Sequence, residues 1–352
     1  MASDRFVERI RLARATAAAS RKVRDEARAA RNRCLDMVHQ DRSLGRRIDE
    51  RRVVSTGASG RLSKDSVSLG PMRMVGVVDS ARGLVPRGHL CWAYRDRAEF
   101  RARAVEFIAD GIAAGQWIEY VGSVSTEALR VELTELEGIN ADGPGFEVSP
   151  VGDFYRFAGH SDVVNPVAAV AARVDATEKA LAAGYTGIRA VVDATAVVRS
   201  AEQRDAFARY EHLFDREMCV RPASALCAYD VGELGSTAVA ELACLHPLAN
   251  PGSAPFQLHA ERDVDFALAG DIDLACDELF ATTVRRVVPL SCGPELVVEG
   301  RAMEFIDHRR LLVLIEATQR AGATVVLRNA PGTAARVIEI LQLAGVRVEE
   351  RR

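Results

Sequence analysis

The chain has 352 residues, of which 48% are hydrophobic and 27% are charged, and its formal net charge at neutral pH is −3. This length and composition are typical of a soluble globular protein with two or three domains. No apolar run approaches the roughly 20 residues of a membrane helix, which argues against a membrane protein. The N-terminus has no apolar signal-peptide core; it is Arg-rich and amphipathic, but its Asp and Glu residues argue against a transit peptide. We therefore expect a cytoplasmic protein.

The seven cysteines are odd in number and widely scattered, and no CxxC motif occurs. This pattern predicts reduced thiols in the core of a cytoplasmic protein, not a disulfide framework. No spacing of His, Cys and Asp along the chain is typical of a metal site, so we predict no metal and no cofactor. The cysteines are Cys34, Cys91, Cys219, Cys227, Cys244, Cys276 and Cys292.

Basic residues are concentrated at the N-terminus. Residues 1–52 contain 15 Arg and Lys but 8 Asp and Glu, a net charge of +7, whereas the remainder carries −10. Residues 3–40 lack Gly and Pro and are rich in Ala and Arg, so we predict that the 1–52 segment is helical. This helix either folds against the acidic body or binds an acidic partner, nucleic acid included. Residues 53–74, largely Gly- and Ser-rich, are predicted to form a flexible linker.

From Gly88 onward, apolar strand-like runs alternate with amphipathic helical segments. This alternation predicts an α/β domain over residues 75–252, with a mainly parallel sheet and helices on both of its faces. The predicted strands are 89–94, 116–122, 146–151, 187–198 and 223–230. The predicted helices are 95–115, 166–184, 202–218 and 232–246.

Residues 246–255 contain three prolines and predict a domain boundary. Beyond it, residues 256–352 follow the order strand, strand, helix, strand, helix, strand, helix, and we expect this second α/β domain to fold on its own. Its predicted strands are 256–261, 265–270, 295–300 and 323–329. Its predicted helices are 271–288, 307–322 and 332–345.

The order of elements in residues 88–230 resembles a RecA-type nucleotide-binding domain. Such a domain holds phosphate in a glycine-rich loop after its first strand. The corresponding junction, CWAYRDRAEF (91–100), has no glycine, no lysine and no GK[ST] motif, so we expect weak or no ATP binding. Asp193 ends an apolar strand, where a magnesium-binding acid would lie, but without that loop we predict that it caps the following turn. We find no catalytic constellation and predict that the protein is not an enzyme.

Six short motifs lie in order between Gly88 and Gly252: HLCWAY, VEFIADGIAAGQWIEYV, GYTGIRAVVDATAV, YEHLFDRE, SALCAYD and ELACLHPL. In these motifs the chain resembles the MEDS domain, a RecA- and KaiC-like sensory domain of methanogen and methylotroph regulators. The resemblance implies a domain that senses small molecules, thought to be hydrocarbon derivatives. It transfers no ligand-binding residue to this chain.

Ligands of open parallel sheets bind at the carboxyl ends of the strands. The residues on strands and strand ends that we predict to line such a pocket are His89, Trp92, Tyr94, Tyr120, Asp193, Tyr229 and Asp230. The alternative is that the aromatic side chains fill the core and the polar ones form turns. Among the other histidines, we expect His246 to cap carbonyls at a helix end, and His160 and His212 to lie at the surface.

Three stretches near the C-terminus are FALAGDIDLAC (266–276), LVVEGRAMEFIDHRRLLVLIEATQRAG (296–322) and VVLRNAPGTAARVIEILQLAGV (325–346). They resemble a STAS domain, the fold of bacterial anti-sigma-factor antagonists. In that family a kinase-like anti-sigma factor phosphorylates a serine that follows an aspartate. Here His308 follows Asp307, so the resemblance implies the partner-docking surface without its phosphoacceptor; the alternative is a drifted, solvated loop. The predicted partner surface comprises Asp271, Asp307, His308, Arg309 and Arg310.

These features predict a signalling protein that senses a small molecule through its first α/β domain and binds a protein partner, an anti-sigma factor or related regulator, through its second. The alternative function is a nucleic-acid-binding or oligomeric scaffold that acts through residues 1–52. Deletion of residues 1–70 distinguishes the two, because only the scaffold should lose partner binding while both domains stay folded.

Overall fold

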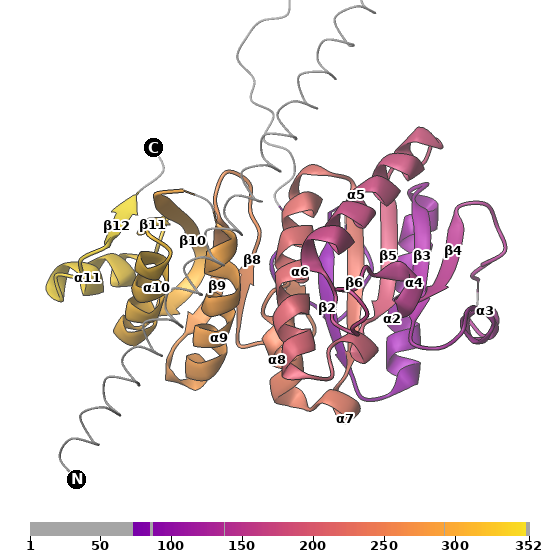
Figure 1. Ribbon diagram of the computed structural model, residues 1–352, viewed down its shortest axis with the longest axis horizontal. Helices are drawn as coiled ribbons and strands as arrows, with labels where there is room; N and C mark the ends of the chain where they lie inside the picture. Colours follow the sequence, from indigo (N-terminus) through magenta and orange to yellow (C-terminus); the bar gives the residue numbers. More distant parts are fainter. Residues whose placement is uncertain (1–72, 85–86, 137, 292, 350–352) are drawn as a thin grey trace, which may run out of the picture.

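The computed structural model of the protein describes residues 73–349, apart from residues 85–86, 137 and 292. The predicted helix at 1–52 lies outside the described residues. Two α/β domains lie side by side (Figure 1), the first on a seven-stranded sheet and the second on a five-stranded sheet. The α/β class predicted from the sequence is confirmed.

The sheet of the first domain is parallel throughout, in the order β1-β7-β2-β6-β5-β3-β4. Strand β7 pairs with both β1 and β2, so the first part of the proline-rich 246–255 segment belongs to the sheet of the first domain. The strands are β1 (Gly76–Val77), β2 (His89–Tyr94), β3 (Trp117–Gly122), β4 (Phe146–Pro150), β5 (Ile188–Asp193), β6 (Ala223–Asp230) and β7 (Leu248–Ala249).

Side-chain caps mark the start of most helices of the first domain. At α6, Ser200 and Gln203 form a reciprocal capping box. The single helix predicted at 232–246 is wrong, because Gly235, with φ of 80°, separates α7 from α8. The helices are α2 (Arg97–Ala113), α3 (Thr126–Thr134), α4 (Val151–Phe154), α5 (Pro166–Ala182), α6 (Ala201–Val220), α7 (Val231–Leu234) and α8 (Ser236–Ala243), with a 3-10 turn, η1, at Thr195–Val197.

Alternation along the strands builds a separate core on each face of the first sheet. On β2, Leu90, Trp92 and Tyr94 pack in the core on the α2 side of the sheet. Cys91, on the opposite side of the same strand, belongs to the core that contains residues of α5 and α6. The side of the sheet on which a β2 residue lies therefore decides which helices it meets.

The second domain has the sheet order β12-β11-β10-β9-β8, and only the β8–β9 pair is antiparallel. The predicted order of elements is confirmed, but β10 is longer than predicted and β12 was not predicted. The strands are β8 (Phe256–His259), β9 (Phe266–Ile272), β10 (Glu295–Ile306), β11 (Thr324–Arg328) and β12 (Val346–Glu349). The helices are α9 (Asp277–Val287), α10 (His308–Arg320) and α11 (Gly332–Ile340), with 3-10 turns η2 (Leu274–Cys276) and η3 (Val288–Leu290).

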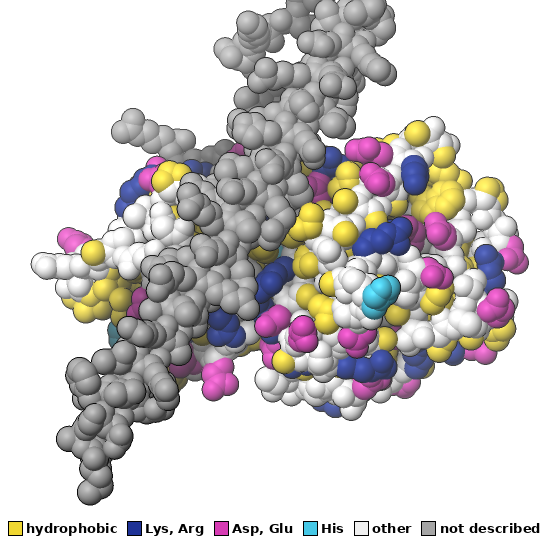
Figure 2. Space-filling model, viewed as in Figure 1, with side chains coloured by type: hydrophobic (Ala, Val, Ile, Leu, Met, Phe, Trp, Pro, Cys, Tyr) yellow, Lys and Arg dark blue, Asp and Glu magenta, His cyan; other side chains and the backbone are white. Residues whose placement is uncertain are grey.

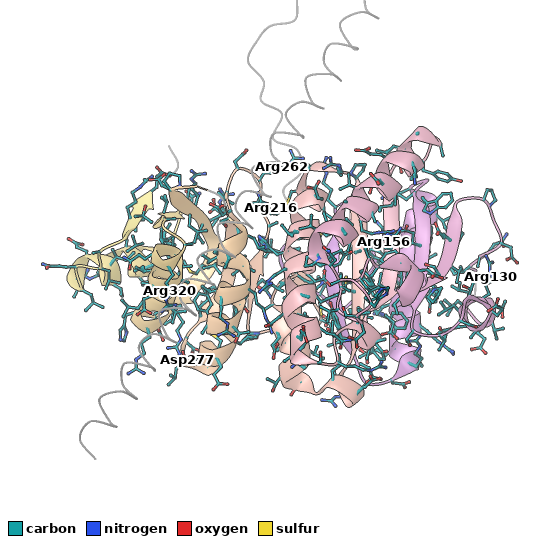
Figure 3. The ribbon with its side chains drawn as sticks, in the orientation of Figure 1. Arg130, Arg156, Arg216, Arg262, Asp277 and Arg320 are labelled. Carbon is teal, nitrogen blue, oxygen red and sulfur yellow. The ribbon has the colours of Figure 1, made fainter. Side chains whose placement is uncertain are left out.

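The two domains are joined by a continuous hydrophobic core. It runs from the α5 and α6 side of the first sheet into the second domain, and α9 packs against α6 and α8. Arg286 of α9, which is 4% exposed, pairs with Asp205 of α6 at 2.6 Å and with Glu241 of α8 at 2.7 Å. Arg262 donates from Nε to the carbonyl of Cys219 at 2.7 Å, at the domain junction in Figure 3. Apolar packing and polar contacts both cross the junction.

The outer surface carries both signs of charge. On the face of the first domain visible in Figure 2, basic and acidic side chains are interspersed, which does not favour a partner of one charge. The five cysteines within the described part of the chain are buried free thiols, as predicted. Among the helices that the structure describes, none is both long and apolar enough to cross a membrane.

Candidate functional site

The junction between β2 and α2 is where the resemblance to a RecA-type domain would place a phosphate loop. Asp96 caps α2 by accepting a hydrogen bond from Ala98 N at 2.9 Å, so its own carboxylate lies where a phosphate would bind. Asp193 accepts from the hydroxyl of Tyr94 at 3.0 Å and forms an ion pair with Arg97. Asp193 also accepts from Thr195 N at 3.2 Å, which confirms the predicted cap.

The pocket predicted from seven strand residues is wrong. Trp92, Tyr94 and Tyr120 are buried in the core on the α2 side of the first sheet, whereas Tyr229 is buried in the opposite core. Asp193 is occupied as described above, and Asp230 caps α7. The strands that carry these residues were predicted, although the one predicted at 187–198 ends at Asp193. Period-two alternation sends neighbouring residues to opposite faces of the sheet, so these side chains cannot line one cavity. His89 belongs to a different site.

A cleft lies at the carboxyl edge of the first sheet, where ligands of parallel sheets bind. Its volume is about 310 Å³, which is at the small end of ligand sites. The amide of Asn250 accepts from Ala93 N and donates to Ala93 O, both at 2.8 Å, and so holds the cleft wall to β2. The lining residues are Ala93, Arg95, Glu99, Val231, Ser236, Val239, Asn250, Pro251, Gly252 and Ser253.

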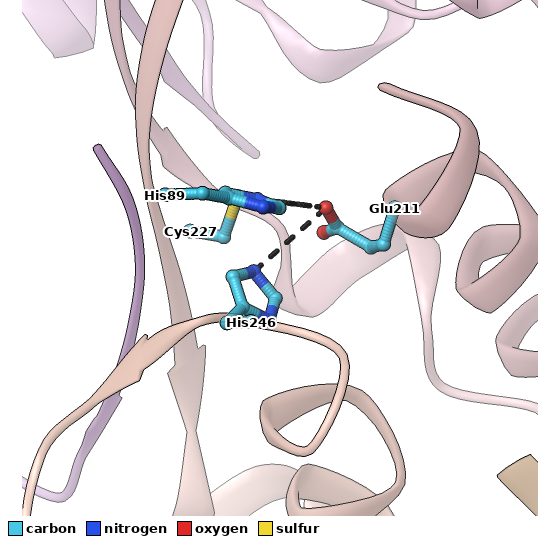
Figure 4. Close-up of side chains that lie close together, drawn as sticks. All are labelled: His89, Glu211, Cys227 and His246. Carbon is cyan, nitrogen blue, oxygen red and sulfur yellow. Dashed lines mark hydrogen bonds and ion pairs between the residues drawn. The ribbon is translucent and has the colours of Figure 1, made fainter. Parts of the chain in front are cut away.

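Four side chains of types that can bind a metal ion meet inside the first domain: His89 of β2, Glu211 of α6, Cys227 of β6 and His246, which follows α8. We call them the buried polar cluster (Figure 4). His89 Nε2 lies 3.2 Å from Glu211 Oε2 and 3.6 Å from Cys227 Sγ. His246 Nε2 lies 3.7 Å from the same Glu211 oxygen, and all four side chains are buried.

A second set of groups orients the buried polar cluster. Asp215 accepts from His89 Nδ1 at 2.8 Å and forms an ion pair with Arg73. The other Asp215 oxygen accepts from Ala260 N at 2.7 Å, just after β8, so this carboxylate reaches the second domain. Tyr229 donates to Glu211 Oε1 at 2.7 Å. Because Arg73 is held by its ion pair with Asp215, the prediction of a flexible linker over 53–74 is wrong at this residue.

The charges of the buried polar cluster are strongly coupled. Burial would lower the pKa of His89, but the hydrogen bonds and charges of Asp215 and Glu211 raise it above its usual range. Burial would raise the pKa of Asp215, but the Arg73 charge and the His89 hydrogen bond hold it well below the usual range. Burial and the charge of His89 lower the pKa of His246 to about 4, so this ring is neutral at pH 7.

Sequence spacing gave no sign of this cluster, because its members come from four separate segments that only the sheet order brings together. The cap predicted for His246 is confirmed, since its Nδ1 donates to Leu242 O at 2.9 Å. His160 is exposed as predicted. The surface position predicted for His212 is wrong, because that ring is fully buried beside Phe266 and within the described residues neither ring nitrogen has a hydrogen-bond partner.

The predicted partner surface of the second domain is placed at one end of β9 and β10. Asp271, His308 and Arg309 are exposed there. Asp307 caps α10 by accepting from Arg310 N at 2.9 Å. The prediction for the Arg310 side chain is wrong: it is 0% exposed and paired with Asp307 at 2.9 Å and Asp277 at 2.5 Å. Its charge is neutralised inside the fold and is not presented to a partner.

Exposed apolar side chains lie in the same part of the second domain. Leu274 of η2 is 66% exposed, while Phe305 of β10 and Leu312 of α10 are each 39% exposed. The backbone bond from Asp307 N to Ile272 O, at 3.2 Å, holds the ends of β9 and β10 together.

Comparison with known proteins gives a family match for most of the first domain. Residues 88–247 match the family model described as MEDS: MEthanogen/methylotroph, DcmR Sensory domain. The resemblance to the MEDS domain predicted from the six motifs is thus confirmed over these residues. The match covers β2 to the residue after His246, and so includes all four members of the buried polar cluster. No curated protein and no solved structure matches the chain.

Proposed function

We propose that the protein is a signalling protein whose MEDS domain senses a small molecule and whose second domain binds a protein partner. The observation that carries the proposal is the match of residues 88–247 to a sensory domain family, on a domain that shares its hydrophobic core with a second α/β domain. A sensory domain acts by changing the affinity of another site. The shared core supplies a physical connection for that change.

The cleft is the proposed sensing site. Its volume of about 310 Å³ admits only a small molecule. Val231 and Val239 supply apolar contacts, while Arg95 and Glu99 supply charge at the rim. This combination favours a short hydrocarbon derivative with one polar group. That ligand class agrees with the small molecules that the MEDS resemblance implies.

The route from the cleft to the second domain is short. Ser236 and Val239 line the cleft from α8, and α8 packs against α9 of the second domain. Just after α8, Cys244 O accepts from Leu258 N of β8 at 2.6 Å, and Cys244 Sγ lies 3.3 Å from Thr283 Oγ1 of α9. A ligand that shifts α8 therefore changes groups that touch the second domain directly.

The second domain is the proposed output, with a STAS-like partner mode. Apolar Leu274, Phe305 and Leu312 beside basic Arg309 favour an acidic protein surface with an apolar centre, such as an anti-sigma factor or related regulator. The segment from Asp307 to Arg310 holds no serine or threonine. Partner binding would thus be governed by the sensor and not by phosphorylation of this loop.

A cleft-filling variant tests the sensing site. Ser236→Trp places a bulky ring in the cleft from an exposed position, and Ala182→Trp places the same ring at an exposed site on α5 as the matched control.

Each full chain is melted with a panel of one- to six-carbon alcohols, amines, halides and carboxylic acids. A panel member should raise the Tm of wild type and control but not of Ser236→Trp. A panel without effect on the wild-type chain would contradict the proposed ligand class, and an equal effect on all three would exclude the cleft.

A further inference from the structure

We propose that the buried polar cluster, His89, Glu211, Cys227 and His246, is a structural binding site for a divalent transition-metal ion of the zinc class. The four side chains offer two imidazole nitrogens, one carboxylate oxygen and one thiolate sulfur, and these ligand atoms all lie within 4.8 Å of one another (Figure 4). Imidazole, thiolate and carboxylate are the ligands that zinc takes in proteins. This inference is independent of the ligand proposed for the cleft.

The distances between the ligand atoms fit a tetrahedron around one ion. Zinc lies about 2.0–2.1 Å from nitrogen or oxygen and about 2.3 Å from sulfur, so tetrahedral edges are about 3.3–3.6 Å. The edge from His89 Nε2 to Glu211 Oε2 is 3.2 Å, and that from His89 Nε2 to Cys227 Sγ is 3.6 Å. The edges from Glu211 Oε2 to His246 Nε2 and to Cys227 Sγ are 3.7 and 3.9 Å. These four edges lie within a few tenths of an ångström of tetrahedral values, and the two remaining edges, from His246 to His89 and to Cys227, are no longer than 4.8 Å.

The surroundings aim the ligand atoms at a common centre. His89 donates from Nδ1 to the Asp215 carboxylate, and His246 donates from Nδ1 to Leu242 O, so each ring directs Nε2 inward. A histidine whose other nitrogen donates to a carboxylate or a carbonyl is the usual arrangement around protein-bound metals. His246 Nε2 is buried and makes no hydrogen bond within the described part of the chain. A bound cation would satisfy it.

The charges also balance. With a divalent cation bound, Glu211 and the Cys227 thiolate carry two negative charges, His89 and His246 are neutral, and the site has no net charge. Asp215 then retains its ion pair with Arg73. Four protein ligands fill the tetrahedral positions, which is typical of a structural and not a catalytic site. Such an ion ties β2, α6, β6 and the segment after α8 to one point.

Metal content of the purified full chain tests the inference, with the affinity tag removed so that only the chain binds metal. Elemental analysis should find about one zinc ion per wild-type chain. Cys227→Ser and His246→Ala should each lower that content at least tenfold. Cys244→Ser, which alters a buried thiol at the domain junction, is the matched control and should retain the ion.

Cobalt separates loss of the thiolate ligand from loss of the whole site, because a folded variant that still binds cobalt keeps visible d–d bands. The wild-type chain refolded with Co²⁺ should show intense visible d–d bands of tetrahedral cobalt and a near-ultraviolet thiolate-to-cobalt band. Cys227→Ser should lose the near-ultraviolet band, whereas Cys244→Ser should keep it. A folded wild-type chain without bound metal after refolding with Zn²⁺ or Co²⁺ would overturn the inference, as would an unchanged near-ultraviolet band in Cys227→Ser.

Discussion

Replacing Asp215 by Asn should destabilise the protein strongly. One Asp215 oxygen accepts from His89 Nδ1 and pairs with Arg73, and the other accepts from Ala260 N at 2.7 Å. All three partners are donors, so whichever way an Asn amide is turned, its NH₂ group faces at least one donor. The Arg73 charge would also lose its anionic partner.

The magnitude follows from the burial of the pair. The Asp215 side chain is 0% exposed and that of Arg73 is 9% exposed, so solvent screens their interaction little. Breaking a buried pair by removing one charge costs about 3–5 kcal/mol. That loss is a large fraction of the roughly 5–15 kcal/mol of a typical folded domain. Glu316→Ala, which removes an exposed partner of Arg320 on α10, should cost at most about 0.5 kcal/mol.

Urea unfolding of the full chain, followed by far-ultraviolet circular dichroism, measures the effect. Because the two domains share one core, we expect a single transition in the wild-type chain. Asp215→Asn should move its midpoint down by about 1 M or more, given slopes of about 1–3 kcal/mol per M for small proteins. A loss below about 1 kcal/mol, similar to that of Glu316→Ala, would refute the assignment of Asp215 as a buried link between the domains.

Three further predictions concern pH, nucleotide and domain independence. Burial lowers the pKa of His212 to about 3, against about 6.5 unfolded, so between these values the unfolded chain binds more protons and stability falls as the pH is lowered. Between pH 7 and pH 5, the free energy of unfolding measured by urea titration should therefore fall by about 2 kcal/mol less in His212→Leu than in wild type. Equal falls in the two proteins would contradict the burial of this ring. Titration calorimetry with ATP and magnesium should give weak or no binding, because Asp96 caps α2 and Arg97 neutralises Asp193; a low-micromolar dissociation constant would contradict this. The fragment 256–352, expected from the sequence to fold alone, should melt at a lower temperature than the full chain, because it leaves the α9 face without α6 and α8; an equal Tm would show that the junction adds no stability.

The sequence predicted those features that depend on interactions between residues close together in the chain. The cap by Asp193 and the carbonyl contact of His246 depend on neighbours within a few residues, and both are confirmed. The alternation of strands and helices predicted the fold class for the same reason. The absence of a glycine-rich loop at 91–100 could also be read from the sequence, because a phosphate loop of this type is one contiguous segment.

Contacts that depend on strand order could not be predicted from those patterns. His89 and His246 meet because β7 lies beside β2, although β7 has only two residues and gave no strand signal. The buried position of Arg310 depends on Asp277, which comes from another helix. The prediction of a seven-residue pocket was wrong because it placed residues at strand ends without deciding on which face of the sheet each side chain lies.

The proposed function requires that residues 88–247 sense a small molecule and that its binding changes the second domain. Hydrogen exchange of the full chain, with and without the panel member that raises its Tm, tests this most directly. We predict slower exchange in residues 231–253, which line the cleft, together with altered exchange in β8 and α9 of the second domain. Slower exchange confined to the cleft, with no change beyond residue 255, would contradict the claim.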